Sequence, residues 1–124
     1  MLKSSAIDPR ALANDLSERW SPRVIGALDD YYVKVAKVCG ELVWHSHDDQ
    51  DELFFVLQGR LRLHLPDREV ELGPGQLFVV PKGVRHLPMA DEECLLMLIE
   101  RKDTAHTGDV VSERTRSIDE QLRS

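Results

Sequence analysis

The segment Trp44-His45-Ser46-His47-Asp48-Asp49-Gln50-Asp51-Glu52 says most about the fold and function of this 124-residue chain. Residues two apart on a strand point to the same face, so the imidazoles of His45 and His47 are expected to project together. Glu52 follows a polar turn and opens the next apolar run, where its carboxylate can approach the same point. Imidazoles and a carboxylate brought together in this way predict a metal site.

A third imidazole comes from His86, which follows Pro81-Lys82-Gly83 at the predicted start of another strand. The predicted ligands of one divalent metal ion per chain are therefore His45, His47, Glu52 and His86. Three imidazoles and one carboxylate suit Fe, Mn, Co, Ni, Cu or Zn, and without a thiolate in the set the identity of the metal stays open. A histidine alone on a surface is usually only polar, and we interpret His64 and His106 in that way.

The rest of the chain predicts an all-β domain. Short runs rich in Val, Leu, Phe and Tyr alternate with turn residues such as Gln58-Gly59 and Gly73-Pro74-Gly75. About eight closely spaced strands, with a turn at 90–93, are typical of a β-sandwich or barrel. The predicted strands are Arg23–Leu28, Tyr31–Cys39, Glu41–His47, Leu53–Gln58, Arg60–Leu65, Glu69–Leu72, Leu77–Val80 and Cys94–Glu100.

Both ends of the chain differ from this β pattern. Asp8-Pro9 predicts the start of a helix, because Asp caps free amide groups and Pro suits the first helical position. We divide the chain into an N-terminal helical segment (1–22), a barrel (23–101) and a polar C-terminal extension (102–124). The extension is expected to pack loosely and to end in a short helix. One helix is not a helix-turn-helix, so no DNA-reading module is expected.

Two blocks of the sequence resemble the motifs of the cupin superfamily. The first motif combines a glycine, an H-x-H pair, a glutamate and a second glycine, matched here by Gly40, His45, His47, Glu52 and Gly59. The second motif ends on a histidine, and is matched by Gly75, Pro81, Gly83 and His86. The chain departs from the pattern in a shorter spacing between Gly40 and His45, and in Ala90 where the motif has asparagine. Neither departure removes a metal ligand.

The resemblance implies a double-stranded β-helix, or jelly-roll barrel, preceded by a short helix, with one metal at the four positions. The chain is also similar to small stand-alone bacterial cupins without an assigned function, which indicates no substrate. The leading hypothesis is a metal-dependent enzyme of the isomerase, cyclase, lyase or oxygenase type that acts on a small organic metabolite. The alternative is a non-catalytic module that binds a small molecule or a metal. Metal content and oxygen consumption would distinguish the two.

Alternation along the strands also predicts a pocket and an interface. Val43, Phe54 and Val56 are expected to share the metal-facing side and to line a small-molecule pocket in the barrel mouth. The opposite side carries Leu53, Phe55 and Leu57, which are too apolar for a solvated surface. Because large apolar patches usually mark interfaces, and cupins commonly dimerise through such faces, we expect a homodimer.

Charge and hydropathy exclude several classes of partner. A net charge of −6 argues against non-specific binding to the phosphate backbone of nucleic acids. No apolar run approaches the ~20 residues that a membrane-spanning helix needs, so no membrane partner is expected. Asp8 and Asp15 interrupt the start of the chain, which does not resemble a secretory signal, and two cysteines are too few for a disulfide scaffold. We therefore expect a cytoplasmic protein.

Overall fold

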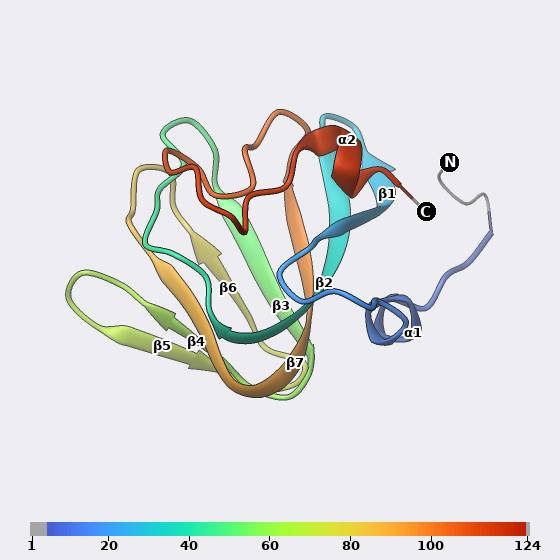
Figure 1. Ribbon diagram of the computed structural model, residues 1–124, viewed down its shortest axis with the longest axis horizontal. Helices are drawn as coiled ribbons and strands as arrows, with labels where there is room; N and C mark the ends of the chain where they lie inside the picture. The colour runs from blue at the N-terminus through green and yellow to red at the C-terminus, as the bar shows by residue number, and fades with distance from the viewer. Residues whose placement is uncertain (1–4, 124) are drawn as a thin grey trace.

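Strands dominate the computed structural model, which describes residues 5–123; the outermost parts of the predicted terminal segments, 1–4 and 124, lie outside the described residues (Figure 1). The predicted all-β barrel with a short N-terminal helix is confirmed. The elements are helix α1 (Pro9–Asn14), strands β1 (Arg23–Leu28), β2 (Tyr31–Glu41), β3 (Glu52–Gln58), β4 (Leu61–His64), β5 (Glu69–Leu72), β6 (Leu77–Val80) and β7 (Leu87–Arg101), and helix α2 (Ile118–Gln121).

Strand β7 holds the antiparallel barrel together. Its C-terminal half lies between β2 and β3 in the order β1-β2-β7-β3-β6, whereas its N-terminal end pairs with β4, which in turn pairs with β5. The predicted turn at 90–93 is wrong, because β7 continues through it. Cys39 of β2 stands opposite the three exposed residues Asp91-Glu92-Glu93, and the register shifts there. A bulge thus lets one strand pass around a corner of the barrel, and its acidic residues face solvent.

The predicted strand Glu41–His47 is also wrong. Strand β2 continues to Glu41, and the next residues form an irregular segment with no continuous ladder. It is joined to the barrel by single contacts, among them the Leu42 N–H, which donates to Pro88 O at 3.1 Å, and an isolated antiparallel bridge between His45 and His86. Gly40 has φ +79°, a conformation that glycine adopts readily and that ends the regular extended run. In this segment the His45 N–H donates to His86 O at 3.1 Å, and the His86 N–H donates to His45 O at 2.9 Å.

The core fills the inside of the barrel, and a second cluster lies outside it. Inward-facing residues of the core include Val38, Phe54, Val56, Leu61 and Leu96, all buried. Outside, Ala13 of α1 packs on Val35, Leu95 and Leu57, so the helix covers one end of the outer sheet face. As predicted, the Asp8 carboxylate caps α1 by accepting from the Arg10 and Ala11 amides. None of the helices among residues 5–123 has the length and apolar character to span a membrane.

The segment after β7 does not pack loosely, in contrast to the prediction. It crosses the end of the barrel, and α2 reaches β1 (Figure 1). Thr104, Thr107 and Gln121 are fully buried. The predicted final helix is confirmed as α2, which begins with a capping box between Ser117 and Glu120. Some of these polar groups are paired within the segment: the Thr107 and Thr115 hydroxyls are 2.6 Å apart, and Gln121 Nε2 donates to Arg116 O at 3.0 Å. The Thr104 hydroxyl and Gln121 Oε1 are buried without a hydrogen-bond partner, so the polarity of the segment did not prevent its burial.

Candidate metal centre

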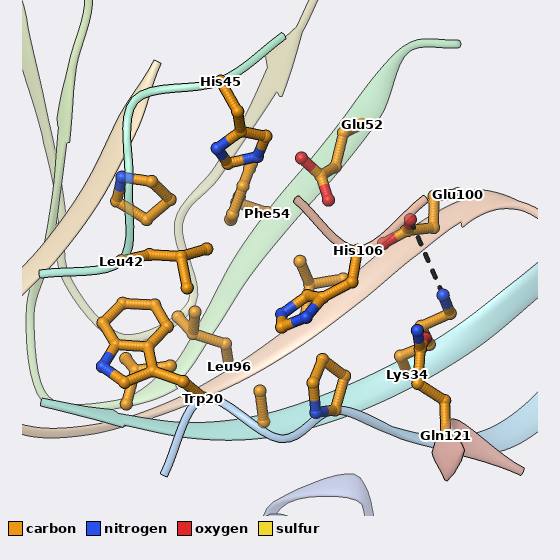
Figure 2. Close-up of a pocket in the computed structure, with 15 residues that line it drawn as sticks. Trp20, Lys34, Leu42, His45, Glu52, Phe54, Leu96, Glu100, His106 and Gln121 are labelled. Atoms are coloured by element: carbon orange, nitrogen blue, oxygen red, sulfur yellow. Dashed lines mark ion pairs between the residues drawn. The ribbon is translucent and has the colours of Figure 1, made fainter. Parts of the chain in front are cut away.

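The structure brings the four predicted ligands together. His45 and His47 lie on the irregular segment between β2 and β3, Glu52 is the first residue of β3, and His86 directly precedes β7. All four side chains are buried, and one ligand atom from each lies within 4.8 Å of the others. Figure 2 shows His45 and Glu52 facing one another at one end of a cavity.

Glu52 occupies the middle of this cluster. Its Oε1 lies 3.2 Å from His47 Nε2 and 3.3 Å from His86 Nε2. The third imidazole is close by, with the ring centroids of His45 and His86 4.3 Å apart. The four side chains are therefore close enough to share a single small cation.

Two backbone carbonyls fix which nitrogen of each ring faces the centre. His45 Nδ1 lies 2.8 Å from Val43 O, and His86 Nδ1 lies 3.0 Å from Val84 O. Because a carbonyl only accepts, Nδ1 carries the proton in each ring, and the neutral ring presents a lone pair on Nε2. His86 Nε2 faces Glu52 Oε1, and either a proton on Nε2, as a hydrogen bond, or a cation bound to both atoms can lie between them. The donor set therefore fits a metal ion that replaces this proton.

The protonation states also suit metal binding. Burial, followed by the neighbouring His86, lowers the pKa of His45 to about 4, so the ring is neutral at pH 7. Burial raises the pKa of Glu52, but hydrogen bonds from His47 and His86 outweigh it and hold that pKa well below its usual value. A neutral imidazole and an ionised carboxylate are the forms that bind metals, because a bound proton would occupy the lone pair.

A cavity extends from His45 and Glu52 into the barrel (Figure 2). Its walls are mostly apolar, and its volume is about 30 Å³, room for one or two water molecules. The apolar lining includes Trp20, Ala36, Leu42, Phe54, Leu96 and Leu98. Of the three residues predicted to line a pocket, Phe54 is in this wall, Val56 is buried in the core away from it, and Val43 contributes its carbonyl to His45.

Sequence reasoning missed an ion pair at the other end of the cavity. Lys34 Nζ lies 3.6 Å from Glu100 Oε2, and both side chains are buried. Glu100 stands directly across from Glu52 in the β3–β7 ladder. Burial, followed by the charge of Glu52, raises the pKa of Glu100 against the opposing effect of Lys34. The signal was available, because both residues occupy inward positions on strands whose other inward residues are apolar.

The interpretation of His106 as a surface residue is wrong. It lines the cavity beside Lys34 and Gln121, where Nδ1 accepts from the Arg116 N–H at 2.9 Å (Figure 2). Burial lowers its pKa to about 4. No sequence pattern marks this residue, because its position depends on how the C-terminal segment crosses the barrel.

Comparison with known proteins agrees with this architecture. A family model described as "Cupin domain" matches residues 32–100. The uncharacterized protein YdbB of Bacillus subtilis is 33% identical over 93 residues, which cover 74% of this chain and 82% of YdbB. A 3-hydroxyanthranilate 3,4-dioxygenase 2 of Aspergillus clavatus is 24% identical over 86 residues; the match covers 65% of this chain and only 45% of that enzyme.

Solved structures show the same fold. A crystal structure of a cupin-2 domain containing protein from Shewanella frigidimarina has a TM-score of 0.74 and 45% sequence identity, covering 77% of this chain and 93% of that one. Protein NMB1881 from Neisseria meningitidis has a TM-score of 0.72 and 28% identity, covering 78% of this chain and 99% of that one.

Proposed function

The chain belongs to the cupin family, and from this premise we propose that it is a metal-dependent enzyme that acts on a small organic metabolite. In this proposal His45, His47, Glu52 and His86 hold one divalent transition metal ion. The observation that carries it is the buried cluster of three imidazoles and one carboxylate whose ligand atoms lie within 4.8 Å of one another. Burying these polar groups is costly unless they are compensated, and a bound cation compensates them together.

The donor set narrows the choice of metal. Three nitrogen donors and one oxygen suit Fe, Mn, Co, Ni, Cu or Zn, whereas Ca²⁺ and Mg²⁺ prefer oxygen ligands. When bound, such an ion supplies Lewis-acid or redox chemistry to a ligand in the cavity. The protein's part is to orient the rings through the Val43 and Val84 carbonyls and to exclude bulk water through the apolar walls.

The reaction belongs to the isomerase, cyclase, lyase or oxygenase types. The similarity to 3-hydroxyanthranilate 3,4-dioxygenases favours testing oxygenase chemistry first, although it extends over less than half of those enzymes. Lys34, Glu100, His106 and Gln121 are the polar side chains that a ligand would meet beyond the metal ligands.

One observation favours a second candidate, a non-catalytic module that binds a metal or a small ligand. The cavity inside the barrel holds about 30 Å³, so a metabolite larger than a few atoms could enter it only if lining side chains moved. A protein that only retains a metal has no such requirement.

We further propose that the protein is a homodimer formed through the outer face of the sheet. Strand pairing places Leu53 beside Val79 and Phe55 beside Leu77 on that face, beyond the part covered by α1. Leu77 is 56% exposed and Val79 is 41% exposed. Contiguous apolar surface of this kind usually marks an interface.

The deciding experiment measures metal content and oxygen uptake together. Protein purified without chelators is analysed for all six metals, and the Fe²⁺-loaded protein is then tested for oxygen consumption with 3-hydroxyanthranilate and a panel of small metabolites. Glu52→Ala serves as the site-dead variant. A near-stoichiometric metal with no turnover on any compound would favour the binding module. If wild type retained no more of any metal than Glu52→Ala, both candidates would be excluded.

A further inference from the structure

The C-terminal segment returns to the part of the chain that carries two of the metal ligands. The Ser46 N–H, between His45 and His47, donates to Asp109 Oδ1 at 3.0 Å. In the opposite direction, the Asp109 N–H donates to Ser46 O at 3.1 Å. Both backbone polar groups of Ser46 are therefore satisfied by one residue that lies 63 positions away in the sequence.

Gly108 makes this close approach possible. It has φ +56°, and a Cβ added there would collide with the Ser46 carbonyl oxygen and would lie 2.8 Å from Ser46 C and 3.2 Å from His45 Cδ2. Any larger residue would have to push the C-terminal segment away from the ligand-bearing segment, besides adopting a backbone conformation that only glycine tolerates easily.

Asp109 also reaches the segment that carries the third imidazole. Its Oδ2 lies 4.0 Å from Nη1 of Arg85, the residue before His86. This ion pair is exposed and by itself contributes little. Its significance is geometric, because a single carboxylate contacts both stretches of chain from which the imidazoles project.

The ligand-bearing segment needs such support. It has no strand ladder along its length, and it is held instead by the His45–His86 bridge and by the Gly83 N–H, which donates to His47 O at 2.8 Å. Between these two anchors, the Asp109 contacts are the backbone hydrogen bonds of Ser46. Metal ligands must be placed to within a few tenths of an ångström, so an anchor between two of them affects both.

We propose that the Gly108-Asp109 turn is a clasp on the metal centre, in which Asp109 is a positioning residue for His45 and His47. The inference rests on the proposed metal binding. Because coupling between two equilibria is reciprocal, the docked clasp strengthens metal binding, and a bound metal holds the clasp in place.

Titration of the full-length protein with Mn²⁺, Ni²⁺ and Zn²⁺, each alone, tests the proposal. Asp109→Ala removes the carboxylate acceptor and should weaken binding about tenfold, the lower end of the loss seen when residues that support metal ligands are removed. Asp109→Asn keeps an acceptor oxygen and should retain most of the affinity. Because Asp109 is exposed, neither change should unfold the protein.

A pair of glycine variants and one acidic control variant separate positioning from general destabilisation. Gly108→Ala should weaken metal binding at least as much as Asp109→Ala. Its control is Gly75→Ala, which also places alanine at a positive φ (+81°) but has no atom within 4 Å of the added Cβ. Asp103→Asn removes a nearby acidic charge from the groove beside His47 without touching Ser46. Neither control should change the affinity.

Amide hydrogen exchange supplies a readout that does not require metal. In the metal-free protein, Asp109→Ala and Gly108→Ala should speed exchange at Ser46, whereas Gly75→Ala should not. In wild type, added metal should slow exchange at Asp109. If the wild-type protein bound no metal, the proposed function would be wrong. The exchange rate at Ser46 would still show whether Gly108 and Asp109 hold the segment that carries His45 and His47. The clasp is wrong if Asp109→Ala and Gly108→Ala bind metal like wild type, or if Ser46 exchange is unchanged in both.

Discussion

Replacing His86 by alanine tests the metal centre separately from the stability of the barrel. The His86 side chain is fully buried, and its Nε2 lies 3.3 Å from Glu52 Oε1. Its removal leaves two imidazoles and one carboxylate, the ligand set of a facial triad, which still binds metals but less tightly. The pKa of Glu52 should rise, because one of the two hydrogen bonds that lower it is lost. We expect the barrel to stay folded, since its core strands do not depend on this side chain.

The size of the effect follows from linkage between binding and unfolding. A metal at 100 times its Kd stabilises the wild-type fold by ~2.7 kcal/mol. For a domain of 124 residues the entropy of unfolding is ~0.26 kcal/mol/K, which converts this gain into a rise in Tm of about 10 °C. If His86→Ala weakens binding 10- to 100-fold, the gain at the same metal concentration falls to ~0.4–1.4 kcal/mol, or about 2–5 °C.

The assay is thermal unfolding with and without Fe²⁺, Mn²⁺, Ni²⁺ or Zn²⁺, under conditions that keep iron reduced. Only the metal-dependent difference in Tm is compared, because alanine at a buried position also lowers the Tm of the metal-free protein. His64→Ala is the matched control, since His64 is 29% exposed and lies outside the ligand cluster. The assignment of His86 as a metal ligand would be refuted if no metal raised the Tm of the wild type. It would also be refuted if metal raised the Tm of His86→Ala as much as that of the wild type.

Three further predictions concern the buried polar groups and the outer face. In the metal-free protein, burial lowers the pKa of His106 from 6.5 to about 4, so the free energy of unfolding should fall by about 3 kcal/mol between pH 6.5 and pH 4 as the unfolded chain takes up a proton that the folded protein does not. Urea unfolding at several pH values measures this dependence, and His106→Gln should flatten it over that range. The same pH dependence in the variant would contradict the burial of His106. Lys34→Met leaves Glu100 beside Glu52 without its cation, and it should lower the free energy of unfolding by ~3–5 kcal/mol in the same assay. The double variant Lys34→Met/Glu100→Leu should recover part of this loss. A change within about ±0.5 kcal/mol for Lys34→Met would show that stability does not depend on the pair. Leu77→Asp should change the molar mass measured by light scattering at micromolar concentration from that of a dimer to that of a monomer. Leu28→Asp, at a similarly exposed residue outside the proposed interface, should leave the dimer mass unchanged. A monomer mass for the wild type would refute the proposed interface.

The ligand set was predictable because the four residues stand at motif positions, yet the reasoning about their geometry was only partly correct. A regular strand through His45 and His47 was expected to make their imidazoles converge, and that strand is absent. His45 is placed instead by its bridge to His86, and His47 by the Gly83 amide. The convergence therefore depends on hydrogen bonds between segments distant in sequence, which strand periodicity does not describe.

Strand alternation correctly predicted which side of β3 faces inward, but it could not locate the corner in β7. The acidic run Asp91-Glu92-Glu93 has the composition of a turn, and the same composition suits a solvent-facing bulge. Alternation did contain one unused signal. Lys34 and Glu100 are polar residues at inward positions, where an unpaired charge would be too costly, so each required a partner inside the barrel.

The C-terminal segment shows why the metal centre and the barrel should respond differently to perturbation. The barrel is held by continuous ladders and an apolar core, whereas the ligand-bearing segment is held by isolated backbone hydrogen bonds, among them those to Asp109. Regions with few ladder bonds open at a lower free energy than the core. Metal loss should therefore loosen residues 45–47 and the Gly108-Asp109 turn well before it affects β2, β3 or β7. Because the ligand-bearing segment and the barrel are stabilised by different contacts, changes in the C-terminal segment can alter metal affinity without changing the fold.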